Sequence, residues 1–186
     1  MGTVFQWMVE NKDLITSWTA IFAVVASAAS FGIAALNMRM QRRHNRTSVL
    51  PIGHVTVGDY ENELFVRVWN YGVGPMIIKK MIVEGEDGAD QNVPGIVDLM
   101  PKLPGKCAWS TFVRNISDRA IPANDHITLI LLQGGEDDSD FVAARQMVRK
   151  ALSGLTVKVE YKDIYGETMP PAVRNLKWFG RHWSQA

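Results

Sequence analysis

The sequence predicts a mainly β protein with an N-terminal single transmembrane α-helix, followed by an antiparallel β-sandwich or small barrel with one crossover helix. Three observations support this prediction. Residues 14–38 contain no charged side chain. After residue 53, apolar and polar residues alternate with a period of two in several short segments, as in half-buried strands. The segment 138–152 instead repeats its apolar residues with the spacing of a helix.

The uncharged segment 14–38 is long enough to cross a bilayer, because its 25 residues exceed the roughly 20 needed for a hydrocarbon core about 30 Å thick. A cleaved signal peptide and a buried core helix are the alternatives. A signal peptide needs a basic leading region and a short apolar core, whereas here acidic residues precede the segment and its apolar run continues past Ala26-Ser27-Ala28. A core helix rarely extends so far without charge. We therefore expect a retained anchor.

Arginine predicts the orientation of this anchor. Four arginines follow the segment and only Lys12 precedes it, and cytoplasmic flanks are the ones enriched in Lys and Arg. We expect Arg39, Arg42, Arg43 and Arg46 at the membrane surface, near anionic headgroups. The expected order is an extracytoplasmic N-terminus (1–13), a transmembrane helix (14–40) with Asp13 as its N-cap, a basic juxtamembrane linker (41–53) and a cytosolic β-sandwich (54–186). The expected location is the bacterial inner membrane.

Small residues recur four apart in the anchor, a spacing that lets helix backbones approach closely in lipid. The residues that we expect to pack between helices are Ala23, Ser27, Ala28 and Gly32. This pattern predicts self-association and therefore a homo-oligomer. The alternative is that a single-pass helix is simply rich in alanine.

The alternating segments predict seven or eight strands. Glu63–Asn70 and Met76–Glu84 carry the clearest pattern and the most β-branched residues. The other expected strands are His54–Val57, Lys106–Arg114, His126–Gln133, Val157–Lys162 and one around Ala172–Phe179.

The expected helix, Asp138–Leu152, has Asp138 or Ser139 to cap its start and Gly154 to end it. On the opposite side from its apolar stripe, Arg145 and Arg149 are expected to face water.

Two turn motifs lie within this β-rich region. Asn70, Gly72, Gly74 and Pro75 form an Asn-x-Gly-x-Gly-Pro sequence between two strands. Here the glycines allow positive φ, Asn70 can bond the turn backbone, and Pro75 fixes entry to the next strand. The second motif, Tyr-x-Asp-x-x-Gly, contains Tyr161, Asp163 and Gly166 and predicts a hairpin.

In these motifs and in its layout the chain resembles a loosely defined set of bacterial small membrane proteins. Their members have N-terminal membrane helices, a basic juxtamembrane patch and a cytosolic immunoglobulin-like β-sandwich. The layout is similar to that of membrane effectors of anti-phage defence systems, including those that sense cyclic oligonucleotides. The resemblance implies a soluble domain that binds a signal or partner, after which the membrane segments assemble and breach the bilayer. It assigns no ligand-binding residue.

The sequence contains no catalytic, cofactor-binding or metal-binding pattern. None of its four histidines has a partner at metal-ligand spacing, and the acidic runs at 86–90 and 136–140 do not fit a calcium loop. The lone Cys107 excludes an intrachain disulfide framework. With a net charge of +1 no direct binding of DNA or RNA is expected. A membrane-tethered enzyme is the least favoured of three functional hypotheses.

A few cations are candidate contacts for an anionic ligand, although a phosphate needs several of them to converge in space. They are Lys79, Lys80, Arg174, Lys177 and Arg181. The segment 176–183 mixes aromatic and basic residues, and its aromatic side chains either lie on a membrane or partner or pack on the domain core.

The leading hypothesis is a non-enzymatic membrane protein whose β-domain senses a ligand or partner, with a nucleotide second messenger as one candidate, and whose helix self-associates in membrane lipid. The alternative is a constitutive anchor or adaptor that docks another protein.

Overall fold

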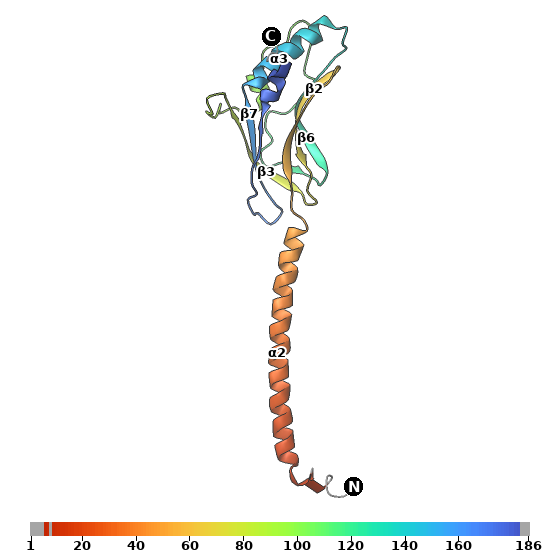
Figure 1. The fold of residues 1–186 in the computed structure, drawn as a ribbon, viewed down its shortest axis with the longest axis vertical. Coiled ribbons are helices and arrows are strands. Elements are labelled where there is room, and N and C mark those ends of the chain that lie inside the picture. Colours follow the sequence, from red (N-terminus) through yellow and green to blue (C-terminus); the bar gives the residue numbers. More distant parts are fainter. Residues whose placement is uncertain (1–5, 8, 183–186) are drawn as a thin grey trace. The chain divides into compact units, whose positions relative to one another are not determined.

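The computed structural model of the chain describes residues 6–7 and 9–182. It contains two units, Met1–Thr47 and Ser48–Ala186. The first unit holds the long helix α2, and the second is a domain of two antiparallel sheets and a further helix, α3, called the β-domain below (Figure 1). The predicted fold class is therefore confirmed.

Helix α2 (Lys12–Thr47) is long and apolar enough to cross a membrane. It has 36 residues, a window of mean hydropathy 2.0, and no buried residue among those described. Asp13 is not its N-cap as expected but lies within its first turn, because the amide of Asn11 already donates to the carbonyl of Trp7. The helix also continues past residue 40 to Thr47, since Gln and Arg, which are good helix formers, make up four of its last seven residues and there is no proline before Pro51.

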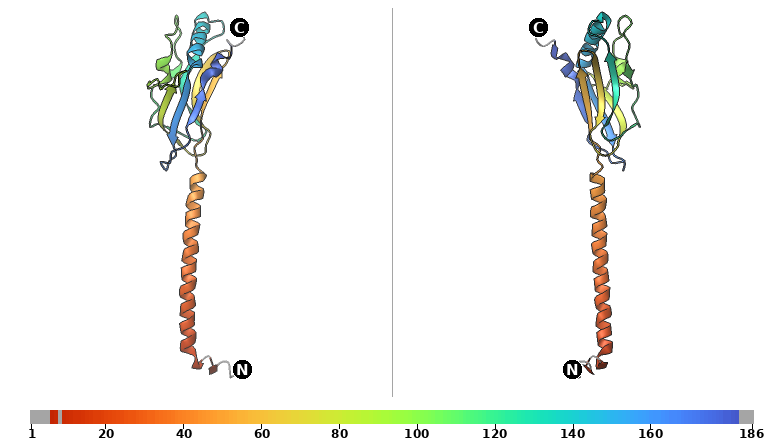
Figure 2. Two further views of the ribbon diagram at one scale, coloured as in Figure 1. Left: turned by 60° about the vertical axis from the view of Figure 1, so that its left-hand side comes forward. Right: turned by 90° about the vertical axis from the view of Figure 1, so that its right-hand side faces the viewer.

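The β-domain is a sandwich of two four-stranded sheets in the described residues. The first sheet, in the order β1-β2-β6-β4, comprises Gly53–Asp59, Glu63–Asn70, Asp125–Gln133 and Thr111–Phe112. The second, in the order β5-β3-β7-β8, comprises Ala120–Ile121, Met76–Glu84, Thr156–Lys162 and Ala172–Asn175. Figure 2 shows the two layers from further directions.

Alternating side chains of both sheets form the core. Leu64, Val66 and Val68 of β2 face inward from the first sheet, while Val157 and Val159 of β7 face inward from the second, and all five are buried. Alternate residues of a strand are expected to be buried in this way when one face of the sheet packs on the core and the other faces solvent. The strands β2 and β3 have the bounds that the sequence predicts.

Two predicted strands are much shorter in the structure. In 106–114 only Thr111–Phe112 forms a strand, because a turn closed by the amide of Cys107 and the carbonyl of Pro104 directs the preceding residues elsewhere. Strand β8 ends at Asn175, whose side-chain oxygen accepts from the amide of Lys177 at 2.8 Å and starts the 3-10 helix η2 (Leu176–His182). The short β5 and the 3-10 helix η1 (Ile96–Leu99) were not predicted from the sequence.

Helix α3 (Ser139–Ser153) connects the two sheets, leaving β6 of the first and entering β7 of the second. The carboxylate of Asp138 accepts from the amides of Asp140 and Phe141, so the predicted N-cap is confirmed. Its apolar stripe is buried as predicted and consists of Phe141, Ala144, Val148 and Leu152. Arg149 is buried as well, so the expectation that it faces water is wrong, for the reason given below.

Candidate functional site

A buried carboxylate, that of Asp59, is the most connected charged group in the described part of the β-domain. Asp59 ends strand β1, at the end of the strand farther from the anchor helix along the chain. Its side chain is 0% exposed. Because an isolated buried carboxylate is costly, this position requires cationic partners.

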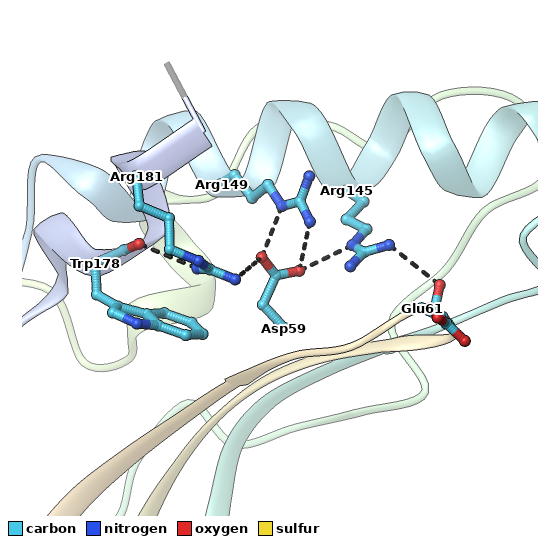
Figure 3. Close-up of polar contacts among 6 residues, drawn as sticks. All are labelled: Asp59, Glu61, Arg145, Arg149, Trp178 and Arg181. Atoms are coloured by element: carbon cyan, nitrogen blue, oxygen red, sulfur yellow. Dashed lines mark hydrogen bonds and ion pairs between the residues drawn. The ribbon is translucent and has the colours of Figure 1, made fainter. Parts of the chain in front are cut away.

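Three arginines supply that charge, and Figure 3 shows them converging on Asp59 from two elements. Arg149 of α3 makes a bidentate contact, with Nε donating to Oδ2 at 2.9 Å and Nη2 donating to Oδ1 at 2.8 Å. Arg145, one turn earlier, donates from Nε to Oδ1 at 2.9 Å. Arg181 of η2 donates from Nη2 to Oδ2 at 3.1 Å. We call Asp59 and these arginines the arginine cluster.

Arg145 and Arg181 make further contacts that hold them in place. Arg145 also donates from Nη1 to the carbonyl of Glu61 at 3.1 Å. Arg181 donates from Nη1 to the carbonyl of Trp178, and its guanidinium carbon lies 3.5 Å from the centre of the Trp178 ring. Arginine stacks well on aromatic faces because its guanidinium is planar and weakly hydrated.

The cluster controls the ionisation of Asp59. Burial acts to raise the pKa of this carboxyl, yet the hydrogen bonds and positive charges of Arg149 and Arg145 hold the pKa below its ordinary value. Asp59 is therefore ionised throughout the physiological range. A permanently charged, fully engaged carboxylate is suited to joining elements and not to transferring protons.

An open cleft of about 670 Å³ lies beside the arginine cluster. Its walls come from the β1–β2 turn, from the loop before α3 and from two members of the cluster, and consist of Asp59, Tyr60, Glu61, Asn62, Glu136 and Arg145. The exposed carboxylates of Glu61 and Glu136 give this rim an acidic character. Such a lining favours a basic or hydrogen-bonding ligand over a phosphate.

Sequence reasoning missed the arginine cluster. Its members lie 86, 90 and 122 residues from Asp59 along the chain, so no local pattern joins them. One local signal was available, because Arg145 and Arg149 are one helical turn apart and border the apolar stripe of α3. Long cations in that position often reach a partner across the edge of the core.

The second constellation centres on Asn70, which is fully buried at the end of β2. Its side-chain oxygen accepts from the amides of Ile52 and Gly72, at 3.2 and 3.0 Å. Its amide nitrogen donates to the carbonyl oxygens of Gly74, Ile121 and Pro122 at 2.7, 3.1 and 3.0 Å. Asn70 thus bonds the turn backbone as predicted. It also fixes the segment Val49–Ile52, which we call the strap, against that turn.

Gly72 and Gly74 are needed for a reason other than the expected positive φ, which neither residue adopts. A Cβ on Gly72 would lie 2.3 Å from the carbonyl oxygen of Leu50, and one on Gly74 would lie 1.8 Å from that of Val49. The strap therefore passes so close to the turn that only glycine fits. Pro75 follows and is partly buried.

The Tyr161 to Gly166 motif lies at the same end of the β-domain. The hydroxyl of Tyr161 accepts from the amide of Gly53 at 3.0 Å. Asp163 is buried, and its Oδ1 accepts from the amides of Tyr165 and Glu167, each at 2.8 Å. Gly166 has a φ of +84°, a backbone conformation that glycine adopts without strain.

The five candidate anion contacts do not gather at one place. Lys79 donates to the hydroxyl of Thr168 at 3.0 Å, and Lys80 pairs with Asp90 at 3.5 Å. Arg174 on β8 lies beside Val157 of β7 and Lys177 lies in η2, while Arg181 belongs to the arginine cluster. An anionic site made from all five is therefore not formed.

Apolar side chains of 176–182 pack on the domain. Phe179 and Leu176 are fully buried, and Trp178 is 37% exposed and stacked with Arg181. Trp183 lies outside the described residues. The packing alternative for this segment is therefore the one that the structure supports.

The expected helix-packing residues Ala23, Ser27, Ala28 and Gly32 lie in α2, as do the membrane-surface arginines Arg39, Arg42, Arg43 and Arg46. Ser27 donates its hydroxyl to the carbonyl of Ala23 at 2.7 Å. A Cβ on Gly32 would meet nothing within 4 Å, so a larger side chain is accommodated in a single chain.

Among the described residues no group of three or more His, Cys, Asp or Glu side chains could hold a metal ion. Comparison of the chain with protein-family models, with curated proteins and with solved structures gave no match.

Proposed function

We propose that this chain is a single-pass protein of the bacterial inner membrane that holds a non-enzymatic binding domain at the cytosolic surface. The observation that supports it is α2, whose 36 residues include a strongly apolar window and no buried residue. Side chains such as Phe22, Val24 and Phe31, which are 69%, 69% and 78% exposed, are stabilised by lipid but not by water. The arginines at its C-terminal end support a cytosolic β-domain, because cytoplasmic flanks are enriched in Lys and Arg.

The finer proposal is that the β-domain senses a ligand or protein partner and that α2 then self-associates in the bilayer. In the defence systems that this layout resembles, such assembly perturbs the membrane, and a nucleotide second messenger is one candidate signal. The short linker supports this coupling, because very few residues separate the end of α2 from the strap. Ser48 is the single residue between Thr47, the end of α2, and the strap. Association of domains therefore raises the effective concentration of neighbouring helices.

Double replacement of Ala28 and Gly32 by Leu tests self-association. The added side chains meet open space in a single chain at Gly32, so only close helix–helix contact is obstructed. The matched control replaces Ile21 and Val25 by Leu, which adds little volume. We expect the first variant to lose crosslinked oligomers in native membranes, and any growth arrest on overexpression, while the control keeps both. If both variants behave like the wild type, the helix-packing proposal is wrong.

An adaptor is the second candidate, and the acidic cleft beside the arginine cluster favours it. Glu61 and Glu136 present carboxylates at an open site of about 670 Å³, which suits a basic segment of a partner protein. Charge reversal of both residues to Lys tests this function. The adaptor predicts that a stoichiometric partner copurifies with the wild-type protein and is lost from this variant, while the membrane potential is unchanged in both.

A further inference from the structure

The end of the β-domain that receives the strap is unusually apolar for a loop surface. Two loops and the strap expose large side chains there: Ile52 (58%), Tyr71 (51%), Val73 (66%), Ile164 (45%) and Tyr165 (49%). We call these five residues the apolar rim. A group of exposed apolar side chains on adjoining loops indicates an interaction surface.

Backbone hydrogen bonds and strand pairing bring the three parts of the rim together. The amide of Tyr71 donates to the carbonyl of Ile52 at 2.8 Å, which joins the strap to the β2–β3 turn. The β7–β8 loop lies beside them, because Ile77 at the start of β3 pairs with Lys162 at the end of β7. Figure 1 shows both loops at the same end of the sandwich.

Stacked aromatic side chains continue the rim onto the outer face of the first sheet. Trp69 lies directly opposite His54 on one neighbouring strand and opposite His126 on the other. Its ring stacks on those of Tyr71 and His126, with centroids 5.4 and 4.5 Å apart. Trp and Tyr are the residues enriched at the boundary between membrane and water.

The opposite end of the sandwich differs in character. There the β1–β2 turn and the loop before α3 present Glu61, Asn62 and Glu136 around the cleft, with Tyr60 as the one exposed aromatic side chain among the lining residues. Other exposed apolar side chains of the β-domain, such as Phe112, Val142 and Val173, lie on separate elements. The apolar and acidic surfaces are thus at opposite ends of the strands.

We propose that the apolar rim inserts into the headgroup region of the membrane that α2 crosses. This inference rests on the proposed function, because it requires α2 to span the bilayer. Chain length then restricts the position of the rim, whatever angle the helix and the domain adopt. One residue between Thr47 and the strap corresponds to a reach of about 7–8 Å between Cα atoms. The strap, which packs on the β2–β3 turn, therefore begins two residues after the end of α2 along the chain.

The helix end is itself close to lipid. From Met38, the last residue of the uncharged segment, to Thr47 a helix rises about 13–14 Å, and a headgroup layer is about 5–8 Å thick on each side of the hydrocarbon core. A modest tilt of α2, together with the length of a Tyr or Ile side chain, covers the difference. The tips of the rim side chains can then reach the headgroup layer.

The test places one environment-sensitive fluorophore at a time on the full-length protein in lipid nanodiscs, with Cys107→Ser removing the native thiol. The probe positions are Val73→Cys in the rim, Val142→Cys as an exposed control on α3, and Ala28→Cys within α2. Quenching is measured with lipids that carry the quencher near the headgroup or deep in the acyl chains.

We expect emission from the Val73 probe to shift to shorter wavelength and to be quenched by the shallow quencher, while the Val142 probe shows neither effect. Val73→Asp and Ile164→Asp together should remove this quenching, measured with the probe moved to Ile52→Cys. If the Ala28 probe is quenched by the deep quencher but the Val73 probe is not quenched at all, membrane contact of the rim is wrong and the transmembrane proposal stands. If the Ala28 probe is not quenched, the proposed function itself fails.

Discussion

Arg149 and Asp59 form a two-point ion pair between α3 and the end of β1, with hydrogen bonds of 2.9 and 2.8 Å. Their side chains are 8% and 0% exposed. The two hydrogen bonds of such a pair are charge-assisted and directional. It joins the first sheet to the helix that leads into the second sheet, so one pair links both layers of the sandwich. Removal of this ion pair should therefore destabilise the whole β-domain.

We expect Arg149→Met to lower the free energy of unfolding by about 3 kcal/mol, because removing one partner of a buried pair leaves the other charge poorly compensated. Denaturant unfolding of the full chain in detergent, followed by tryptophan fluorescence, measures the change. Lys150→Met is the matched control, since that neighbouring side chain is exposed and its loss should cost less than about 0.5 kcal/mol. Equal losses in the two variants would contradict a special role for the pair.

Acid should weaken the β-domain through Asp59. The pKa of this carboxyl is lower in the folded state than its ordinary value, so its contribution is fully present above about pH 4. That contribution is lost as the pH falls from there through the folded-state pKa. We expect a plot of unfolding free energy against pH to fall below about pH 4 in the wild type and to be flatter for Asp59→Asn.

Asp137→Asn provides the control for this pH experiment, because Asp137 is exposed in the loop before α3. This variant should keep the wild-type slope. A slope unchanged in Asp59→Asn would show that other carboxyls account for the acid sensitivity.

Gly74→Ala should displace the strap. The new Cβ would lie 1.8 Å from the carbonyl oxygen of Val49, a clash with backbone that no rotamer change relieves. Overpacking of this kind costs about 1–3 kcal/mol. Gly135→Ala is the control, since its Cβ would meet nothing within 4 Å. Limited proteolysis should cut the chain near residues 48–52 faster in Gly74→Ala than in the control or the wild type.

Cys107 should react slowly with thiol reagents at neutral pH. Burial and the negative charges of Asp138 and Asp140 raise the pKa of this thiol, and the thiolate is the reactive form. Asp140→Asn removes one of those charges and should speed alkylation at a fixed pH, whereas Asp137→Asn should not. The second-order rate constant for alkylation, measured across the alkaline range, separates a pKa change from a change in access.

Much of the fold follows from local patterns. The alternation in 63–70 and 76–84 gives strands with the observed bounds, because one wet and one dry face demand a period of two. The helical spacing in 138–152 and the cap at Asp138 likewise locate α3 to within a residue. Short elements such as β5, with two residues, carry too few positions for any periodicity to be visible.

The candidate sites were also predicted only in part from local patterns. The sequence shows that Asn70 belongs to a turn, yet the fact that the strap lies across Gly72 and Gly74 depends on where the chain enters the domain. Positive φ was the wrong explanation for those glycines, since close backbone approach also selects glycine and leaves the same residue in the sequence.

By itself, the sequence determined the uncharged span of 25 residues, the arginine asymmetry that follows it and the order of the main strands, because these depend on residue type and spacing along one chain. Only the tertiary structure decided that Arg145, Arg149 and Arg181 share Asp59. It also decided that the apolar rim lies at the strap and the acidic cleft at the other end of the strands. The residue type alone does not determine which groups a charged or exposed apolar side chain contacts, because those contacts depend on how distant elements pack together.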